Sequence, residues 1–170
     1  MEETIVNKVK ANQKLITLDL AKLFYDKTPV KELDIKQFLF QELLLKEKDF
    51  RSHLKNYDWS QYQDAYLRVY CSTDAIIAPW AWMLLTSYAS EHALDVFHMP
   101  ADQLQHTLYR RNIEEHDWDL YKDKFVLLKG CGDIKVPDSI YLLVTNKLKP
   151  VARKIMYGEA CSNVPVWTSR

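Results

Sequence analysis

The sequence has 170 residues, of which 48% are apolar, and its 23 basic and 23 acidic side chains cancel. This composition excludes a disordered chain, and the balanced charge excludes a general attraction to nucleic acid or anionic membranes. The most apolar stretch, Ala75–Tyr88, is too short to span a bilayer, and the acidic start Met1–Thr4 lacks the apolar core of a signal peptide. We therefore expect a cytoplasmic protein that forms a single domain over residues 1–170, without nucleic-acid or membrane partners.

Apolar runs of strand length alternate along the chain with segments of helical periodicity. The strands are predicted at Leu15–Leu20, Leu33–Lys36, Ala65–Tyr70, Leu94–His98, Phe125–Leu128 and Lys154–Tyr157. The helices are predicted at Leu39–Asn56, at Pro79–Tyr88, at Ala101–Glu115 and from Pro137 onward. This alternation predicts an α/β fold, in which a mainly parallel sheet carries helices on its faces. The helix from Pro79 is apolar nearly all round, so we expect it to be deeply buried.

An imperfect internal repeat of about sixty residues organises the chain. The pattern Asp-Trp-x-x-Tyr-x-Asp occurs at Asp58–Asp64 and again at Asp117–Asp123. In the same alignment Cys71 falls on Cys131, and Pro79 falls on Pro137. The copies are predicted at about 33–99 and 94–158. In each copy we expect the Trp to pack where a helix turns into the next strand, with its indole hydrogen-bonded and the Asp bonded to nearby backbone amides.

Four candidate metal ligands follow predicted strands, namely Cys71, His98, Cys131 and Cys161. Because the carboxyl ends of parallel strands meet at one edge, we expect these side chains to converge there. Three thiolates and an imidazole suit zinc or an iron–sulfur cluster. An odd number of cysteines argues against a disulfide framework. The cysteines are alternatively buried apolar residues, or one of them is a redox or catalytic thiol.

Two acids follow the cysteines, Asp74 and Asp133. They are predicted either to accept hydrogen bonds around a metal site, to replace His98 as ligands, or to make local turns. The sequence lacks the glycine-rich phosphate loops, the nucleophile elbow and the His-Glu-x-x-His pattern of well-known enzymes. It therefore predicts no catalytic residue and leaves open whether the protein is an enzyme.

Several motifs resemble an uncharacterised bacterial family typical of the Bacteroidetes, the domain-of-unknown-function family 2480. The motifs are Glu47–Arg51, Asp58–Tyr62, Cys71–Ile76 and Ile155–Val166. The resemblance extends from Ile5 to the end of the chain and implies no established activity. Members of the family tend to be encoded near iron–sulfur assembly genes, which implies iron–sulfur assembly proteins as partners.

Together the motifs and the resemblance favour a metal-binding or iron–sulfur-cluster-related accessory protein. Its ligands would be Cys71, Cys131 and Cys161, with His98 or an aspartate as the fourth. Two alternatives are a non-enzymatic interaction protein with structural cysteines and a thiol-dependent enzyme. The thiol-dependent enzyme would use Cys131, because glycines flank it.

Overall fold

The computed structural model describes residues 14–130 and 134–169, which form two compact units, each with its own sheet and its own core. Unit 1 consists of residues up to Asp26 and from Gln105 onward, and unit 2 is the continuous segment Lys27–Leu104. The strands therefore form two mostly parallel sheets and not one, which corrects the expectation of a single sheet. That the chain is a single domain, with repeat copies at 33–99 and 94–158, stays a prediction.

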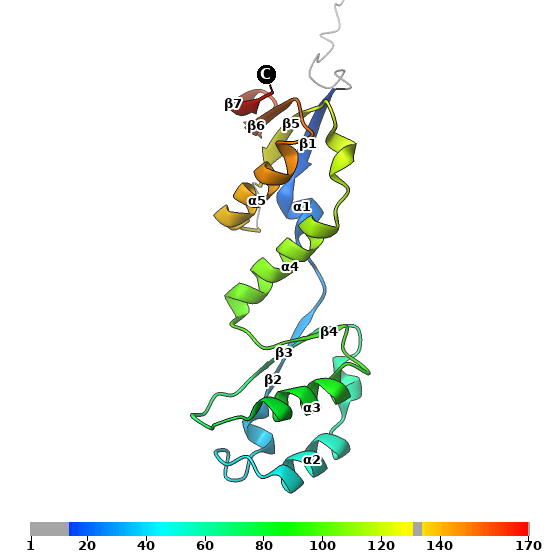
Figure 1. Cartoon of the computed structure of the whole chain (residues 1–170), viewed down its shortest axis with the longest axis vertical. Coiled ribbons are helices and arrows are strands. Elements are labelled where there is room, and N and C mark those ends of the chain that lie inside the picture. The colour runs from blue at the N-terminus through cyan, green and yellow to red at the C-terminus, as the bar shows by residue number, and fades with distance from the viewer. Residues whose placement is uncertain (1–13, 131–133, 170) are drawn as a thin grey trace, which may run out of the picture. The chain divides into compact units, whose positions relative to one another are not determined.

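Unit 2 is a parallel sheet with both of its longer helices on one face (Figure 1). Its elements are β2 (Val30–Asp34), the 3-10 helix η1 (Ile35–Phe38), α2 (Glu47–Asn56), the 3-10 helix η2 (Trp59–Tyr62), β3 (Tyr66–Tyr70), α3 (Pro79–Ala89) and β4 (Asp95–Phe97). The sheet order is β2-β3-β4. Leu67 and Val69 of β3 form the core with buried residues of α2 and α3, among them Phe50 and Leu85.

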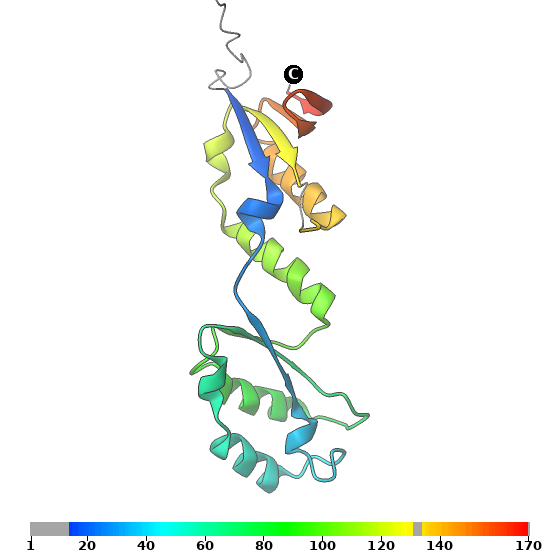
Figure 2. The same ribbon diagram turned by 180° about the vertical axis from the view of Figure 1, so that it is seen from behind.

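Unit 1 has a similar order of strands and helices and one more strand. Its elements are β1 (Leu15–Asp19), α1 (Leu20–Phe24), the part of α4 (Ala101–Glu115) from Gln105 onward, the 3-10 helix η3 (Trp118–Tyr121), β5 (Phe125–Lys129), α5 (Asp138–Leu148), β6 (Lys154–Glu159) and β7 (Ser162–Thr168). The sheet order is β1-β5-β6-β7, and only β7 runs antiparallel to its neighbour. Helix α5 lies in front of the sheet in Figure 1 and behind it in Figure 2, so it covers one face. Its residues Ile140, Val144 and Leu148 are fully buried in the unit 1 core.

The strand ladders of the two units have the same register. Tyr66 of β3 pairs with Val30 and Asp95, and Phe125 of β5 pairs with Leu15 and Lys154. Each of β3 and β5 has five residues, so Cys71 and Gly130 occupy the same position after their strands. Cys131 therefore follows β5 by one residue more than Cys71 follows β3.

Both Asp-Trp motifs form the predicted helix-to-strand turn. Trp59 Nε1 donates to Leu54 O at 2.8 Å, and Trp118 Nε1 donates to Ile113 O at 3.0 Å. Asp58 and its counterpart Asp117 each accept a backbone N–H at 3.0 Å and so cap a 3-10 helix. The sequence prediction of a packing role for this motif is confirmed.

Two predicted helices differ from the structure. The helix expected at Leu39–Asn56 begins only at Glu47, because residues 40–44 close into a tight loop through paired backbone hydrogen bonds between Phe40 and Leu44. Helix α3 begins at Pro79 as predicted, but it is not deeply buried on all sides, since Met83 is 72% exposed. No helix in the described ranges has both the length and the hydrophobicity needed to cross a bilayer.

Candidate functional site

The predicted metal ligands belong to different sheets. Cys71 directly follows β3 and His98 directly follows β4, both in unit 2. Cys161 lies exposed in the turn between β6 and β7 of unit 1. Cys131 and Asp133 lie outside the described residues. The argument that one sheet edge gathers all four side chains is therefore wrong.

Residues 14–130 and 134–169 contain no group of three or more His, Cys, Asp or Glu side chains arranged to hold a metal ion. The ligand set stays a prediction, because Cys131 is one of its members. Within unit 2, Cys71 Sγ lies 3.3 Å from Thr73 Oγ1, and His98 Nδ1 lies 2.9 Å from Val69 O. The His98 ring also stacks on Trp82 with 4.1 Å between centroids. Both side chains thus have local protein partners.

Asp34 anchors the loop that follows β3. Its Oδ1 accepts the backbone N–H of Lys36 at 3.1 Å and that of Ser72 at 3.2 Å. Partial burial opposes ionisation of this carboxyl. The hydrogen bonds from the side chain and backbone of Ser72 and from Lys36 outweigh burial and lower the pKa of Asp34. The carboxylate therefore ties the carboxyl end of β2 to the loop 71–78.

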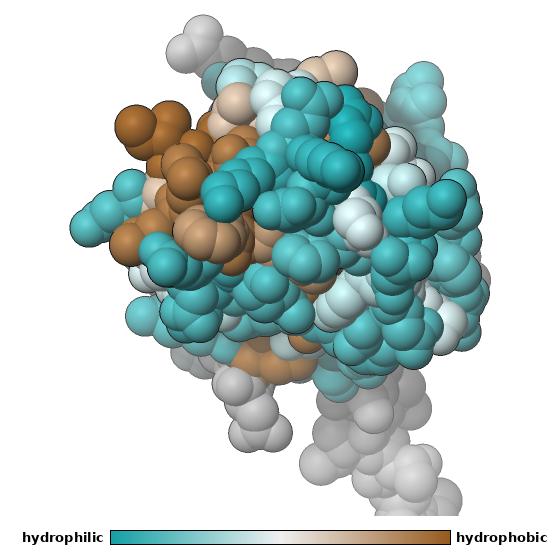
Figure 3. All heavy atoms as spheres, turned by 90° about the horizontal axis from the view of Figure 1, so that it is seen from below, coloured by the Kyte–Doolittle hydropathy of each residue, from teal (hydrophilic) through white to brown (hydrophobic). Residues whose placement is uncertain are grey.

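An apolar hollow, here called the loop hollow, lies between the loops 39–46 and 71–78 of unit 2. Its volume is about 520 Å³. It is lined by Leu43, Leu44, Leu45, Glu47, Asp74, Ala75, Ile76, Ala78 and Trp80. Figure 3 looks at unit 2 from below and shows hydrophobic side chains gathered on one side of this face. Asp74 is exposed and forms no hydrogen bond or ion pair within the described residues, so the predicted local turn is not seen.

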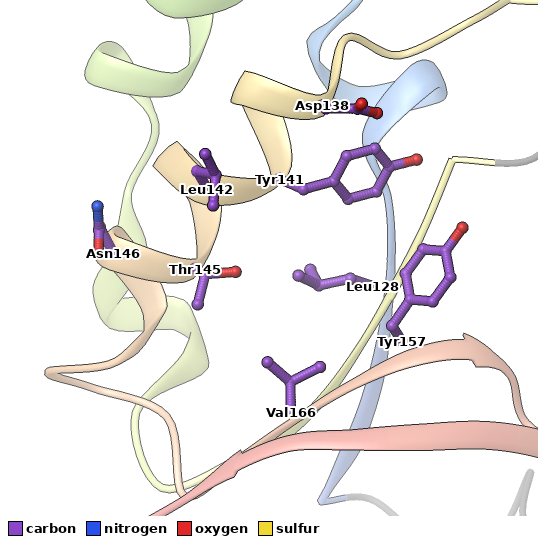
Figure 4. A pocket seen from close by; sticks show the side chains of 8 residues that line it. All are labelled: Leu128, Asp138, Tyr141, Leu142, Thr145, Asn146, Tyr157 and Val166. Atoms are coloured by element: carbon purple, nitrogen blue, oxygen red, sulfur yellow. The ribbon is translucent and has the colours of Figure 1, made fainter.

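A second hollow, here called the α5 hollow, lies in unit 1 between α5 and the strands β5, β6 and β7 (Figure 4). Its volume is about 470 Å³. It is lined by Leu128, Asp138, Tyr141, Leu142, Thr145, Asn146, Tyr157 and Val166. The Tyr141 and Tyr157 rings meet edge to face at 5.7 Å. Val166 of β7 forms a wall that has no counterpart in unit 2, because the described sheet of unit 2 ends at β4.

A buried hydroxyl lies in the same unit. Tyr109 is fully buried, and its hydroxyl has no hydrogen-bond partner among the described residues. Burial, together with the nearby Tyr25, Tyr141 and Asp19 side chains, raises the pKa of Tyr109 to about 12. The hydroxyl therefore stays protonated at neutral pH and remains a donor. Phe50 is the corresponding buried residue of α2 and carries no hydroxyl.

Sequence reasoning missed both hollows. Leu43 and Leu44 fall inside the helix predicted at Leu39–Asn56, although they lie in a loop. Strand β7 was missed because Pro165 interrupts it, although the valines on either side of Pro165 are a strand signal. Asp74 was singled out as a hydrogen-bond acceptor or ligand at a metal site or as a turn residue, and not as part of a binding surface.

Comparison with known families gives one match. The model of the family described as "Protein of unknown function (DUF2480)" matches residues 3–169. No curated protein and no solved structure matches the chain.

Proposed function

The chain belongs to this family of unknown function, and from that premise we propose that it is a non-enzymatic interaction protein. Its unit 2 binds a partner polypeptide at the loop hollow. The bound segment carries a large apolar side chain next to a lysine or arginine.

The observation that supports this most is the exposure of large apolar side chains around the hollow. Ile76 is 91% exposed, and Leu43 and Leu44 are more than half exposed. Phe40 in the same loop is 43% exposed. Contiguous apolar surface on a folded protein usually marks a place where another molecule binds, because covering it removes it from water.

The hollow is preformed by hydrogen bonds within and between its loops. Phe40 N donates to Leu44 O at 2.9 Å, and Leu44 N donates to Phe40 O at 3.0 Å. Thr73 Oγ1 donates to Glu42 O at 2.9 Å and so links the two loops. A surface that is already ordered loses less conformational entropy on binding, which favours a docking role.

The loop 39–46 is also strained. Gln41 and Glu42 adopt φ values of 51° and 59°, which residues other than glycine rarely occupy. Strain of this kind costs of the order of 1 kcal/mol per residue and is often found at functional sites. In this loop the strained backbone at Gln41 and Glu42 forms the turn after which Leu43 and Leu44 are exposed to solvent.

Charge at the hollow favours a cationic neighbour in the partner. The Glu47 carboxylate is already paired with Arg51 at 2.9 Å. Asp74 has no ion pair within the described residues, so its charge is available. A lysine or arginine beside the inserted apolar side chain would pair with it.

The cysteine of unit 2 supports a structural role. Cys71 is partly buried and contacts Thr73, whose hydroxyl links the two loops. The thiol thus helps to hold the hollow together.

The internal repeat belongs to the same proposal. Unit 1 and unit 2 are copies of one ancestral unit, and the second copy is inserted between α1 and α4 of the first. The shared ladder register and the paired tryptophan hydrogen bonds support this origin. The loop hollow and the α5 hollow lie where the copies differ.

The test is selection of peptides from a displayed random library on the full-length protein. We expect the selected peptides to share an apolar residue next to Lys or Arg and to bind the purified protein in fluorescence anisotropy. Ile76→Asp should weaken binding at least about tenfold, and Asp74→Asn about fivefold. Because Ile76 is 91% exposed, its replacement should leave Tm unchanged.

The matched control is Leu120→Asp, which changes an equally apolar side chain of unit 1 that is 59% exposed. This variant should bind the peptides as the unmodified protein does. Selection of no common motif, or equal binding by Ile76→Asp, would refute the proposal.

A further inference from the structure

Helix α5 presents one side to the core and another to the α5 hollow. Ile140, Val144 and Leu148 face the core, whereas Asp138, Tyr141, Leu142 and Thr145 line the α5 hollow. The second set has the spacing i, i+3, i+4, i+7, which places it on one side of the helix. In Figure 4, Thr145 projects from α5 toward Leu128 and Val166. Leu142 in this set is 70% exposed, so part of this side of α5 is available to a ligand.

The dimensions of the hollow suit a small molecule. Its volume of about 470 Å³ lies within the range of about 300–1,000 Å³ common for ligand pockets. The walls are mainly aliphatic and aromatic, and Leu142 is 70% exposed without a ligand. An apolar body between α5 and β7 would remove this surface from water.

Two polar side chains at the hollow, Thr145 and Asn146, have unused hydrogen-bonding capacity within the described residues. In α3 of unit 2, Thr86 Oγ1 donates to Trp82 O at 2.9 Å, and Ser87 Oγ donates to Leu84 O at 2.7 Å. The buried residues Ala81, Leu85 and Ala89 of α3 match Ile140, Val144 and Leu148 of α5, which places Thr145 and Asn146 at the positions of Thr86 and Ser87. The side chains of Thr145 and Asn146 make no hydrogen bond within the described residues. Figure 4 shows the Thr145 hydroxyl pointing into the hollow. The polar side chains at these two positions are thus hydrogen-bonded to their own helix in α3, whereas in α5 they have no such bond and lie beside a hollow.

The charge at the hollow is negative at one end. Asp138 lies at the start of α5 and forms no ion pair within the described residues. Its full negative charge outweighs the roughly half positive charge of the helix N-terminus. The faces of Tyr141 and Tyr157 also attract cations. An anionic ligand such as a fatty acid is therefore disfavoured.

We propose that the α5 hollow binds a small organic amine. The apolar body of the ligand lies between Leu142 and Val166, and its ammonium group lies beside Asp138. Thr145 supplies a further hydrogen bond. This site is separate from the loop hollow, so neither proposal depends on the other.

The test uses 1-naphthylmethylamine as the probe and follows methyl NMR signals of the full-length protein. We expect saturable shifts of the Leu128, Leu142 and Val166 methyl groups. The acid of the same shape, 1-naphthylacetate, should bind at least about fivefold more weakly. Asp138→Asn should weaken binding of the amine by a similar factor but leave binding of the neutral 1-naphthylmethanol unchanged.

A variant that fills the hollow completes the test. Leu142→Trp should abolish binding of all three probes, and its fold should be retained because Leu142 is largely exposed. The control Thr86→Val, in unit 2, should bind as the unmodified protein does. Absence of saturable shifts, equal binding of amine and acid, or shifts confined to Leu43, Leu44 and Ile76 would each overturn the proposal.

Discussion

Gly130 shows how a single residue distinguishes the ends of two corresponding strands. A methyl group at Gly130 would overlap the hydroxyl oxygen of Tyr141 and would lie 3.0 Å from its Cζ and 3.1 Å from Val136 Cγ2. At the matching position after β3, Cys71 has room for a side chain and contacts Thr73. Gly130 therefore permits Tyr141 to pack against the carboxyl end of β5, next to the α5 hollow.

We expect Gly130→Ala to destabilise the protein by about 1–3 kcal/mol, because the added methyl group has no space. The free energy of unfolding in urea measures this effect. Tyr141→Phe removes the oxygen that the methyl group would meet. The double variant Gly130→Ala, Tyr141→Phe should therefore recover part of the loss, and equal losses in the single and double variants would contradict the explanation.

At the scale of single elements, the 3-10 helices η2 and η3 differ in the pair of side chains that hydrogen-bond across them. Tyr57, just before η2, has its hydroxyl 2.9 Å from that of Tyr62. His116, just before η3, has Nε2 2.8 Å from the hydroxyl of Tyr121. Burial lowers the pKa of His116, although the neighbouring Asp117 carboxylate opposes this. The turn of unit 1 is thus sensitive to acid.

We expect His116 to make the stability of the protein depend on pH. The folded state binds the His116 proton less readily than the unfolded state, whose pKa is about 6.5. The contribution of neutral His116 to the free energy of unfolding is therefore complete above about pH 6.5. It is lost as the pH falls toward the lowered pKa of His116 in the folded state. The free energy of unfolding in urea should fall less between pH 7.5 and pH 5.5 for His116→Tyr than for the unmodified protein. This variant reproduces the Tyr57–Tyr62 pair of unit 2. An unchanged decline would contradict this role.

At the scale of the whole molecule, each of the two units has its own hydrophobic core. The unit 2 core draws its residues from a continuous segment, with Leu33 and Ala93 at its ends. The unit 1 core combines Leu18 and its neighbours with residues from Tyr109 onward. A continuous segment with its own sheet and core has what an independently folding domain needs.

We expect a fragment of residues 27–104 to fold without the rest of the chain. Circular dichroism should show α/β secondary structure, and urea should unfold the fragment in one cooperative transition. As a control, Leu67→Asp places a charge in the core and should abolish the transition. A fragment that is unfolded without urea would contradict the independence of unit 2.

Local features of the sequence predicted much of the fold. Helix α3 begins at the predicted proline, and both Asp-Trp turns form as expected, because neighbouring residues determine caps and turns. The division into two sheets was not predictable, since strand pairing depends on contacts far apart in the sequence. The candidate sites were missed for related reasons. Loop 40–44 is held by a bridge and by a link to Thr73, neither of which a helical periodicity reveals.

Three outer strands, β7 of unit 1 and β2 and β4 of unit 2, are poor templates for edge-to-edge aggregation. Strand β7 covers the side of β6 and carries Pro165, which cannot donate a backbone hydrogen bond to an incoming strand. In unit 2, β4 has only three residues, and β2 exposes the charged side chains of Lys31 and Glu32. Short or charged edges are poor templates for adding a strand from another chain. The extra strand of unit 1 thus blunts the sheet edge at β6 as well as forming a wall of the α5 hollow.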